Sequence, residues 1–153
     1  MSEMQQVFQR PSPAERIFNR IFGFLVGLGL GMRHNYLLQV RGRKSGRIYS
    51  TPVNVLDRGG RRFLIAPRGE TQWVRNARAS RQVTLKKGMR RESFVLQVIA
   101  DHEKPELLKA YLDSFSTTVQ RYFPIPAGSG PEAFAPLSAH YPVFELLPIG
   151  PPS

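Results

Sequence analysis

Short stretches of alternating apolar and polar residues, separated by turn residues, fill the middle of this chain and constrain its fold more than any other feature. Glycine-containing turns follow the first two stretches, at residues 42–47 and 57–60. This pattern is typical of short antiparallel strands. We expect strands at residues 36–41, 48–56, 62–66, 82–86, 91–99 and 143–147. Pro52 predicts an edge or a bulge in the second of them, because proline cannot donate to a strand ladder.

Three segments have helical signals instead. Ser12 can cap an amphipathic helix, and Glu15 can complete its capping box. Thr71 can cap a short helix that ends near Ser80, and Pro105 begins a longer one with apolar residues at helical spacing. Five prolines and two glycines in residues 124–142 predict an irregular segment, of the kind that often forms a lid or binding loop.

About six strands with flanking helices predict an α+β, barrel-like domain. The 153 residues show no internal repeat and no domain boundary, so we expect a single domain over residues 1–153, with residues 1–11 a loose tail. The chain has no cysteine, and its three histidines lie far apart without metal-ligand spacing. We therefore expect neither disulfides nor a metal site, and we expect a cytoplasmic protein.

An uncharged run of twelve residues at positions 21–32 is too short to cross a bilayer, which takes about 20 residues. It also lacks a small-residue cleavage site, so it is a poor signal peptide. The favoured interpretation is a helix that covers the open side of the β-domain. The alternative is peripheral membrane contact, with Arg16, Arg20 and Arg33 meeting lipid phosphates.

The basic residues are concentrated in the middle third of the chain. The whole sequence has a net charge of +11, whereas residues 41–91 contain 15 basic and two acidic residues, a net charge of +13. Such concentration indicates an anionic partner: nucleic acid, an acidic membrane surface or a phosphate-bearing small molecule. The alternative is a basic, solvated surface without a specific partner.

The loop at residues 41–47, with the sequence RGRKSGR, is the sharpest local signal. Its glycines can turn backbone N–H groups toward one point, while Arg43 and Lys44 supply charge and Ser45 a hydroxyl. This combination predicts an anion-binding cradle. It lacks the glycine spacing of a Walker A loop, and charge alone fits a solvated hairpin tip equally well.

A second candidate group consists of Arg68, Trp73 and Asn76. The tryptophan could flank a flat ring, and the asparagine could hydrogen-bond a heterocycle or a phosphate. The alternative is a tryptophan in the core. The chain has no GxSxG elbow, and no paired carboxylates in its basic middle. Without an obvious catalytic side chain, an enzyme of this sequence would rely on a cofactor, and we assign no catalytic residue.

These motifs, in this order, resemble the deazaflavin-dependent nitroreductase and quinone reductase family. The resemblance rests on VRGRKSGRIYSTPV (40–53), FLIAPRGETQWVRNARAS (63–80) and YPVFELLP (141–148). It implies a split β-barrel of the FMN-binding type. It also implies an oxidoreductase that binds the deazaflavin coenzyme F420 and passes a hydride from its reduced form to a quinone or nitro-type acceptor.

Site residues follow from the resemblance by position. Arg43, Lys44 and Ser45 match the contacts to the coenzyme's phosphate and polyglutamate tail. The remaining matches are the strand that lines the ring, the loop after the third strand and the short helix: Thr51, Pro52, Asn54, Arg68, Trp73 and Asn76.

The sequence also departs from the family pattern. Ile48-Tyr49 stands where the family often has Pro-Arg, and Pro67 stands in place of a serine. Residues 111–141 match poorly, and we expect them to form the substrate side.

Two alternatives remain beside F420. The first is a split barrel that uses FMN, whose phosphate also needs a basic loop. The second is a basic β-domain that binds nucleic acid or anionic lipid without catalysis. It ranks last because exposed aromatic residues are sparse in the basic strands. We therefore expect a small-molecule redox substrate and no nucleic acid, and the sequence leaves open whether the chain forms a homodimer.

Overall fold

Six antiparallel strands hydrogen-bond to one another in a closed ring in the computed structural model, which describes residues 34–149. The order around the ring is β1-β2-β3-β6-β5-β4. The strand bounds are β1 Asn35–Arg41, β2 Ile48–Arg58, β3 Arg61–Ile65, β4 Gln82–Lys87, β5 Arg90–Val98 and β6 Val143–Pro148. The ring confirms the predicted six-stranded barrel, and each predicted strand lies within two residues of an observed one.

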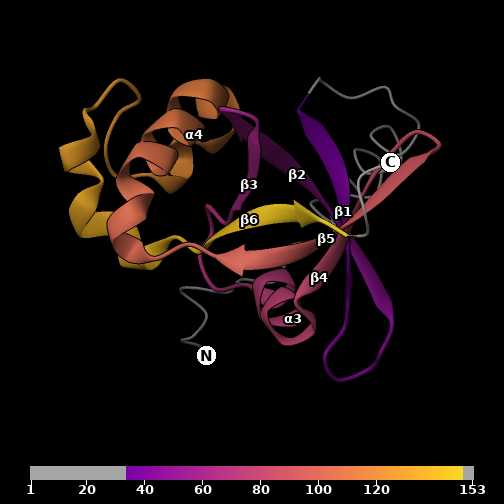
Figure 1. Cartoon of the computed structure of the whole chain (residues 1–153). Coiled ribbons are helices and arrows are strands. Elements are labelled where there is room, and N and C mark those ends of the chain that lie inside the picture. The colour runs from indigo at the N-terminus through magenta and orange to yellow at the C-terminus, as the bar shows by residue number, and fades with distance from the viewer. Residues whose placement is uncertain (1–33, 150–153) are drawn as a thin grey trace.

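Two helices pack against this barrel (Figure 1). Helix α3 (Gln72–Ser80) lies at the end where the β1–β2 loop emerges, and α4 (Lys104–Val119) covers the outside of the barrel beside β2 and β3. Four short 3-10 helices complete the described part: η1 Asp101–Glu103, η2 Gln120–Tyr122, η3 Pro131–Ala133 and η4 Ala135–His140. No described helix is long and apolar enough to cross a membrane.

Alternation along the strands divides the core in two. Val55, Leu64 and Phe144 belong to the cluster that fills the barrel interior. Leu56 and Phe63, their neighbours in sequence, belong to a second cluster that includes the buried face of α4. Because successive strand residues point to opposite faces, each site residue on β2 faces either the barrel interior or the outside of the barrel, part of which α4 covers.

Pro52 lies where the sequence predicted, at a strand edge. It is paired with Leu37 of β1, while the pairing of β2 with β3 begins only at Val55. On its other side Pro52 therefore has no β3 partner, so its missing N–H breaks no ladder.

Thr71 occupies the N-cap position of α3, but its hydroxyl makes no capping hydrogen bond, so the predicted side-chain cap is wrong. The first helical hydrogen bond runs instead from the Arg75 N–H to the Thr71 carbonyl, 3.1 Å.

The stretch predicted to be irregular, residues 124–142, contains η3 and η4. The helix predicted from Ser12 lies outside the described residues.

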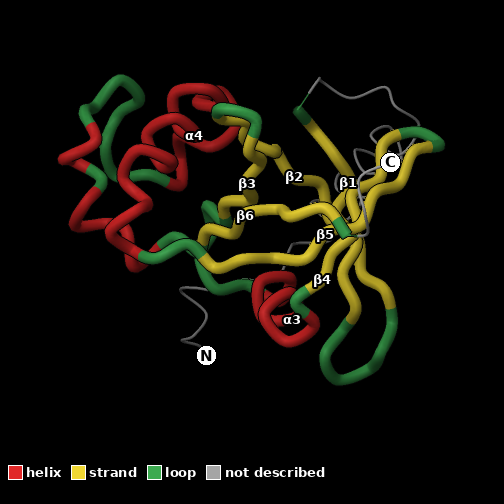
Figure 2. The backbone as a smooth tube through the Cα atoms, in the orientation of Figure 1, coloured by secondary structure: helices red, strands yellow, loops and turns green. Residues whose placement is uncertain are grey.

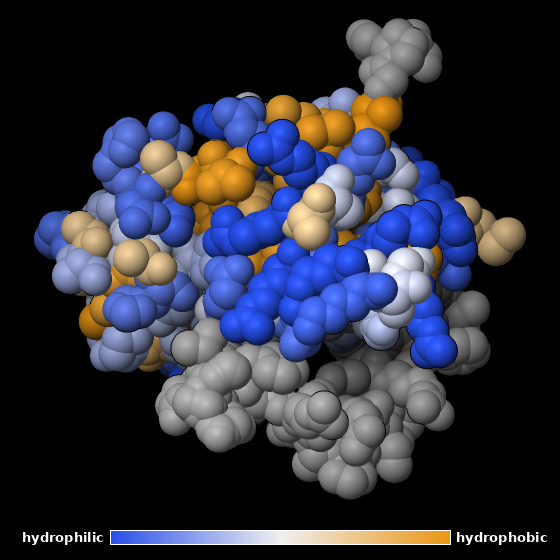
Figure 3. Space-filling model, turned by 90° about the horizontal axis from the view of Figure 1, so that it is seen from below, coloured by the Kyte–Doolittle hydropathy of each residue, from blue (hydrophilic) through white to orange (hydrophobic). Residues whose placement is uncertain are grey.

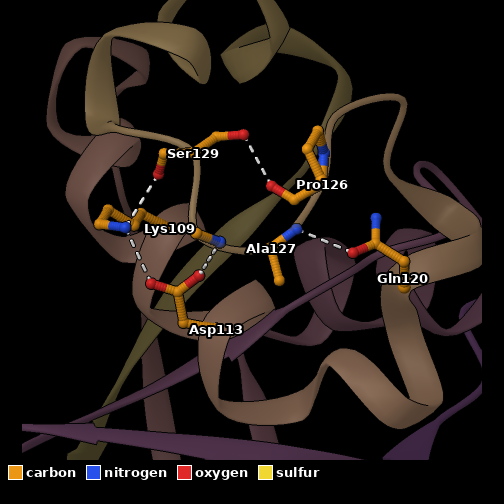
Figure 4. A network of polar contacts seen from close by, with 7 residues as sticks. Lys109, Asp113, Gln120, Pro126, Ala127 and Ser129 are labelled. Carbon is orange, nitrogen blue, oxygen red and sulfur yellow. Dashed lines mark hydrogen bonds and ion pairs between the residues drawn. The ribbon is translucent and has the colours of Figure 1, made fainter.

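Residues 124–130 are fastened to α4 rather than loosely attached (Figure 4). The Lys109 ammonium donates to the Ser129 carbonyl (2.8 Å) and pairs with Asp113 (2.9 Å), whose other oxygen accepts the Gly128 N–H (2.8 Å). These two contacts hold the pKa of Asp113 below its ordinary value. Further along, Phe134 is fully buried. These contacts hold the segment beside α4, and its role as a lid or binding loop stays a prediction.

Candidate functional site

The loop between β1 and β2 is a tight turn built around two glycines. The Gly42 N–H donates to the Arg47 carbonyl (2.6 Å), and the Gly46 N–H donates to the Gly42 carbonyl (3.0 Å). A Cβ on Gly42 would lie 2.6 Å from Cε2 of Tyr49, and Gly46 has a φ of 75°. Both positions therefore favour glycine, one for space and the other for backbone conformation.

Arg43 connects this loop to α3. Its backbone N–H donates to Oδ1 of Asn76 (3.0 Å), and its guanidinium Nη1 donates to the same oxygen (2.8 Å) and to Oε1 of Gln72 (2.9 Å). Asn76 is only 5% exposed. The two predicted groups, the basic loop and the Trp-x-x-Asn helix, are thus hydrogen-bonded to each other. Sequence reasoning missed this bond and assigned both residues to ligand contacts alone.

The positive charge of this loop is not neutralised by the described residues. Arg43, Lys44 and Arg47 are exposed, and no carboxylate of residues 34–149 forms a salt bridge with any of them. Figure 3 views the molecule from the side of α3 and the β1–β2 loop, and hydrophilic residues extend across the centre of this face. The three loop cations, which have no carboxylate partner among residues 34–149, attract anions.

Ser45 is occupied within the loop. Its Oγ accepts the backbone N–H of Arg47 (3.1 Å) and lies 3.2 Å from the hydroxyl of Tyr49. It therefore shapes the turn, and its lone pairs are partly used.

The start of α3 holds an unsatisfied hydroxyl. Thr71 is 7% exposed, and its Oγ1 is buried with no hydrogen-bond partner in the part of the chain that the structure describes. A buried, unpaired hydroxyl is unusual in proteins and is consistent with a partner supplied from outside the chain. Arg68 lies in the exposed loop just before it.

Trp73 is half-buried and contacts the barrel core. Its ring centroid lies 6.3 Å from that of Phe144, a fully buried residue. Part of the indole therefore packs in the core. The rest of the ring is accessible, on the same helix as Asn76.

The three site residues on β2 separate between two faces. Thr51 pairs with Leu38, an interior residue, whereas Pro52 and Asn54 lie on the outer face of the barrel, where Asn54 contacts α4. Asn54 accepts a hydrogen bond from Asn35 and donates to Oγ1 of Thr118 (3.5 Å).

Tyr111 of α4 is also close to Asn54. Its hydroxyl is buried, and this burial raises its pKa, although a hydrogen bond with Asn54 opposes the rise. The phenol therefore stays protonated at neutral pH. Asn54 thus belongs to the α4 side of the molecule, and no described contact joins it to the Arg43–Asn76 pair.

Sequence reasoning missed a second basic region. At the barrel end opposite the β1–β2 loop, an open pocket of about 580 Å³ is lined by Tyr36, Arg62, Leu85, Lys87, Arg90, Arg91 and Glu92. The signal that could have indicated this region is the excess of positive charge in residues 41–91, which include Arg62, Lys87, Arg90 and Arg91. Among the described residues, no group of three or more His, Asp or Glu side chains could hold a metal ion.

Solved structures share the fold at low sequence identity. An F420-H2 dependent reductase (FDR-A) matches with a TM-score of 0.51 and 17% identity, over 74% of this chain and 94% of that one. An FAD-binding protein from Mesorhizobium loti matches with a TM-score of 0.51 and 14% identity, over 85% and 89%. A structure described as a domain-swapped dimer matches with a TM-score of 0.53 and 18% identity, over 87% and 92%.

These likenesses identify the closed ring as a split barrel. No curated protein matches the sequence. One family model does match, that of the F420H2-dependent quinone reductases, and it spans residues 14–122, more than half of the chain. The match includes the β1–β2 loop, the whole of α3 and the bond between them. The chain belongs to the F420H2-dependent quinone reductase family.

Proposed function

We propose that this protein binds reduced coenzyme F420 and transfers a hydride from it to a quinone. The main support for the proposal is that the cationic β1–β2 loop is hydrogen-bonded to α3, through Arg43 and Asn76. Family membership supports F420-dependent oxidoreduction, and the cations of this junction support binding of the coenzyme's anionic end there.

The residues present at the junction fit such a group. The coenzyme has a flat ring, a phosphodiester and a polyglutamate tail, so its far end is a polyanion. Arg43, Lys44 and Arg47 offer cations without carboxylate partners among the described residues, and charged hydrogen bonds are the strong ones.

Each side chain then has a separate role. Lys44 and Arg47 bind the phosphate and tail, while Asn76 positions Arg43 by accepting two of its hydrogen bonds. Trp73 covers one side of the ring and keeps water from it. When bound, the reduced coenzyme supplies the hydride, and a quinone that receives a hydride and one proton becomes a quinol.

The coenzyme assignment is tested by titrating the full chain with F420 and, separately, with FMN. We expect tighter binding of F420. Lys44→Ala should weaken it by about 1–3 kcal/mol, the usual size of a hydrogen bond to a charged group. Arg121→Ala is the matched control, because Arg121 is also an exposed cation but contacts Tyr122 beside α4. Tighter binding of FMN, or equal effects of the two variants, would contradict the proposal.

The acceptor is tested by steady-state turnover with reduced F420. A soluble quinone and a nitroaromatic compound are compared at equal concentration, and we expect the larger kcat/KM for the quinone. A larger value for the nitro compound would leave the coenzyme assignment intact and replace the acceptor class.

A further inference from the structure

Glu70 is the single acid in a long basic stretch of the chain. Residues 58–91 contain eleven basic residues and this one carboxylate. It lies in the loop that joins β3 to α3, which is the green segment leading into α3 in Figure 2. The same helix is hydrogen-bonded to the cationic β1–β2 loop through Arg43. A carboxylate so close to that loop would repel an anionic ligand unless something holds it elsewhere.

Arg78, eight residues further along the chain, holds the Glu70 carboxylate at two points. Nε of Arg78 donates to Oε2 of Glu70 (2.9 Å), and Nη2 donates to Oε1 (3.2 Å). Such a two-point pair fixes the direction of the carboxylate as well as its place. The two side chains are 40% and 36% exposed, so the pair contributes little to stability. Its main effect is therefore on where the carboxylate lies.

The arginine itself is anchored on the barrel core. Its guanidinium carbon lies 5.3 Å from the ring centroid of Phe144, a buried residue of the barrel interior. Trp73, on the same helix, contacts the same ring. A guanidinium over an aromatic face is attracted to it and loses freedom to move. Arg78 therefore has a fixed place, and the carboxylate that it binds has one too.

This place is on the side of α3 that is turned away from the cationic loop. Gln72 and Asn76, four residues apart, share one side of the helix, and both accept hydrogen bonds from Arg43. Arg78 follows Asn76 by two residues, which is about 200° around the axis at 3.6 residues per turn. The pair with Arg78 thus keeps the Glu70 carboxylate on the opposite side from Arg43.

The backbone beside Glu70 is set by the loop and not by this pair. The Gly69 N–H donates to the Ala66 carbonyl (3.1 Å), and the Thr71 N–H donates to the Gly69 carbonyl (2.9 Å). Gly69 has a φ of 80°, which favours glycine. These contacts fix the main chain on both sides of Glu70. Loss of Arg78 would therefore release the Glu70 side chain at a position that stays beside the start of α3.

We propose that Arg78 is a positioning residue, which keeps the Glu70 carboxylate away from the anion-binding side of α3. It acts through Glu70 and touches no ligand itself. Once released, the carboxylate competes with the ligand for the cations of the β1–β2 loop. The inference rests on the proposed function in one respect, that the anion bound at this junction is the phosphate and tail of the coenzyme.

The test is titration calorimetry of the full chain with F420 and, separately, with inorganic tripolyphosphate. Arg78→Ala should weaken the binding of both about tenfold, because the released carboxylate repels the anion. Glu70→Gln should bind both as the unmodified chain does, since the amide has no charge to release. The double variant, Glu70→Gln with Arg78→Ala, should regain the affinity that Arg78→Ala loses. This rescue is the result that a merely structural role of Arg78 would not give.

Arg61→Ala is the matched control. Arg61 also pairs with a glutamate at two points, with Nε 3.0 Å and Nη2 2.7 Å from the oxygens of Glu145, and it also lies over a phenylalanine ring. The pair joins β3 to β6, away from α3. The control removes the same charge and frees a carboxylate elsewhere, so it should leave the binding of both anions unchanged. Circular dichroism of every variant checks that the fold is retained.

Three results would overturn the inference. The first is unchanged binding in Arg78→Ala. The second is a double variant as weak as Arg78→Ala, which would make the pair a structural support of the loop. The third is an equal loss in Arg61→Ala, which would reduce the effect to net charge. Failure of the proposed function is a separate result: the unmodified chain would then bind tripolyphosphate but not F420, and the tripolyphosphate series would still decide the role of Arg78.

Discussion

A single side-chain oxygen, Oδ1 of Asn76, joins the two parts of the candidate site. It accepts two hydrogen bonds from Arg43, one from the backbone and one from the guanidinium. An amide is well suited to this task, because it accepts both bonds without neutralising the arginine, whose charge remains for an anion. Asn76 thus acts through Arg43, as a positioning residue.

Asn76→Ala should lower the free energy of unfolding by about 1–3 kcal/mol, because it removes two hydrogen bonds of Arg43, one of them from the backbone N–H, and leaves a small gap in a buried position. Urea denaturation measures this loss. Asn76→Asp keeps the acceptor, so it should retain most of the stability while its negative charge weakens coenzyme binding. Gln72→Ala removes only the exposed bond and should cost less than either. Equal stability of Asn76→Ala and the unmodified chain would contradict the positioning role.

At the scale of elements, α4 organises the side of the barrel on which Asn54 and Tyr111 lie. Lys109 and Asp113, one helical turn apart, hold residues 128 and 129 against the helix. These contacts are ionic and half-exposed, so they respond to pH without threatening the core.

Acid should release this segment. The pKa of Asp113 is lowered in the folded chain. Its contacts therefore hold residues 128 and 129 fully above pH 3.8, the ordinary pKa of the carboxyl, and they are lost as the pH falls through the lowered pKa. Because the Lys109–Asp113 pair is partly exposed, we expect its loss to reduce the stability of this attachment by about 0.5–1 kcal/mol. Hydrogen exchange at the Gly128 amide measures the release, relative to Asp113→Asn at each pH. A protection ratio that does not change below pH 3.8 would contradict the expectation.

Elements with local signals were predictable from the sequence. Alternation located the strands, and apolar spacing located α4, because both signals lie within a few neighbouring residues. The closure of the ring was not predictable in this way. It depends on pairs such as Phe63 with Glu145, which are far apart in the chain, and only the family resemblance supplied the split barrel.

The same limit applies to the sites. The RGRKSGR loop is contiguous and was predicted as an anion-binding loop, which stays a prediction until binding is measured. The bond between Arg43 and Asn76 depends on how α3 packs. The pocket of Tyr36, Arg62 and Lys87 exists only where four strands end together, so no local motif marks it.

At the scale of the whole molecule, charge governs how ligands arrive. The net charge is +11, and basic groups occupy both ends of the barrel. Long-range attraction of this kind accelerates the association of anions and is screened by salt.

The association rate of F420 should therefore fall about tenfold between low and physiological ionic strength, while the dissociation rate changes less. Stopped-flow measurement of the deazaflavin signal gives both rates. Lys44→Ala should show a shallower salt dependence than the unmodified chain. An association rate independent of salt would contradict electrostatic attraction as the cause.

The closure of the strands into a ring also limits how two copies of this chain could join. Each of the six strands has a neighbour on both sides along part of its length, so the wall is open only where a neighbour stops short, as along residues 48–54 of β2, which have no β3 partner. A second copy of the chain could extend the sheet only at such a stretch, and Pro52 offers no N–H to it. If a homodimer forms through its described parts elsewhere, it must depend on side-chain contacts or on an exchanged segment.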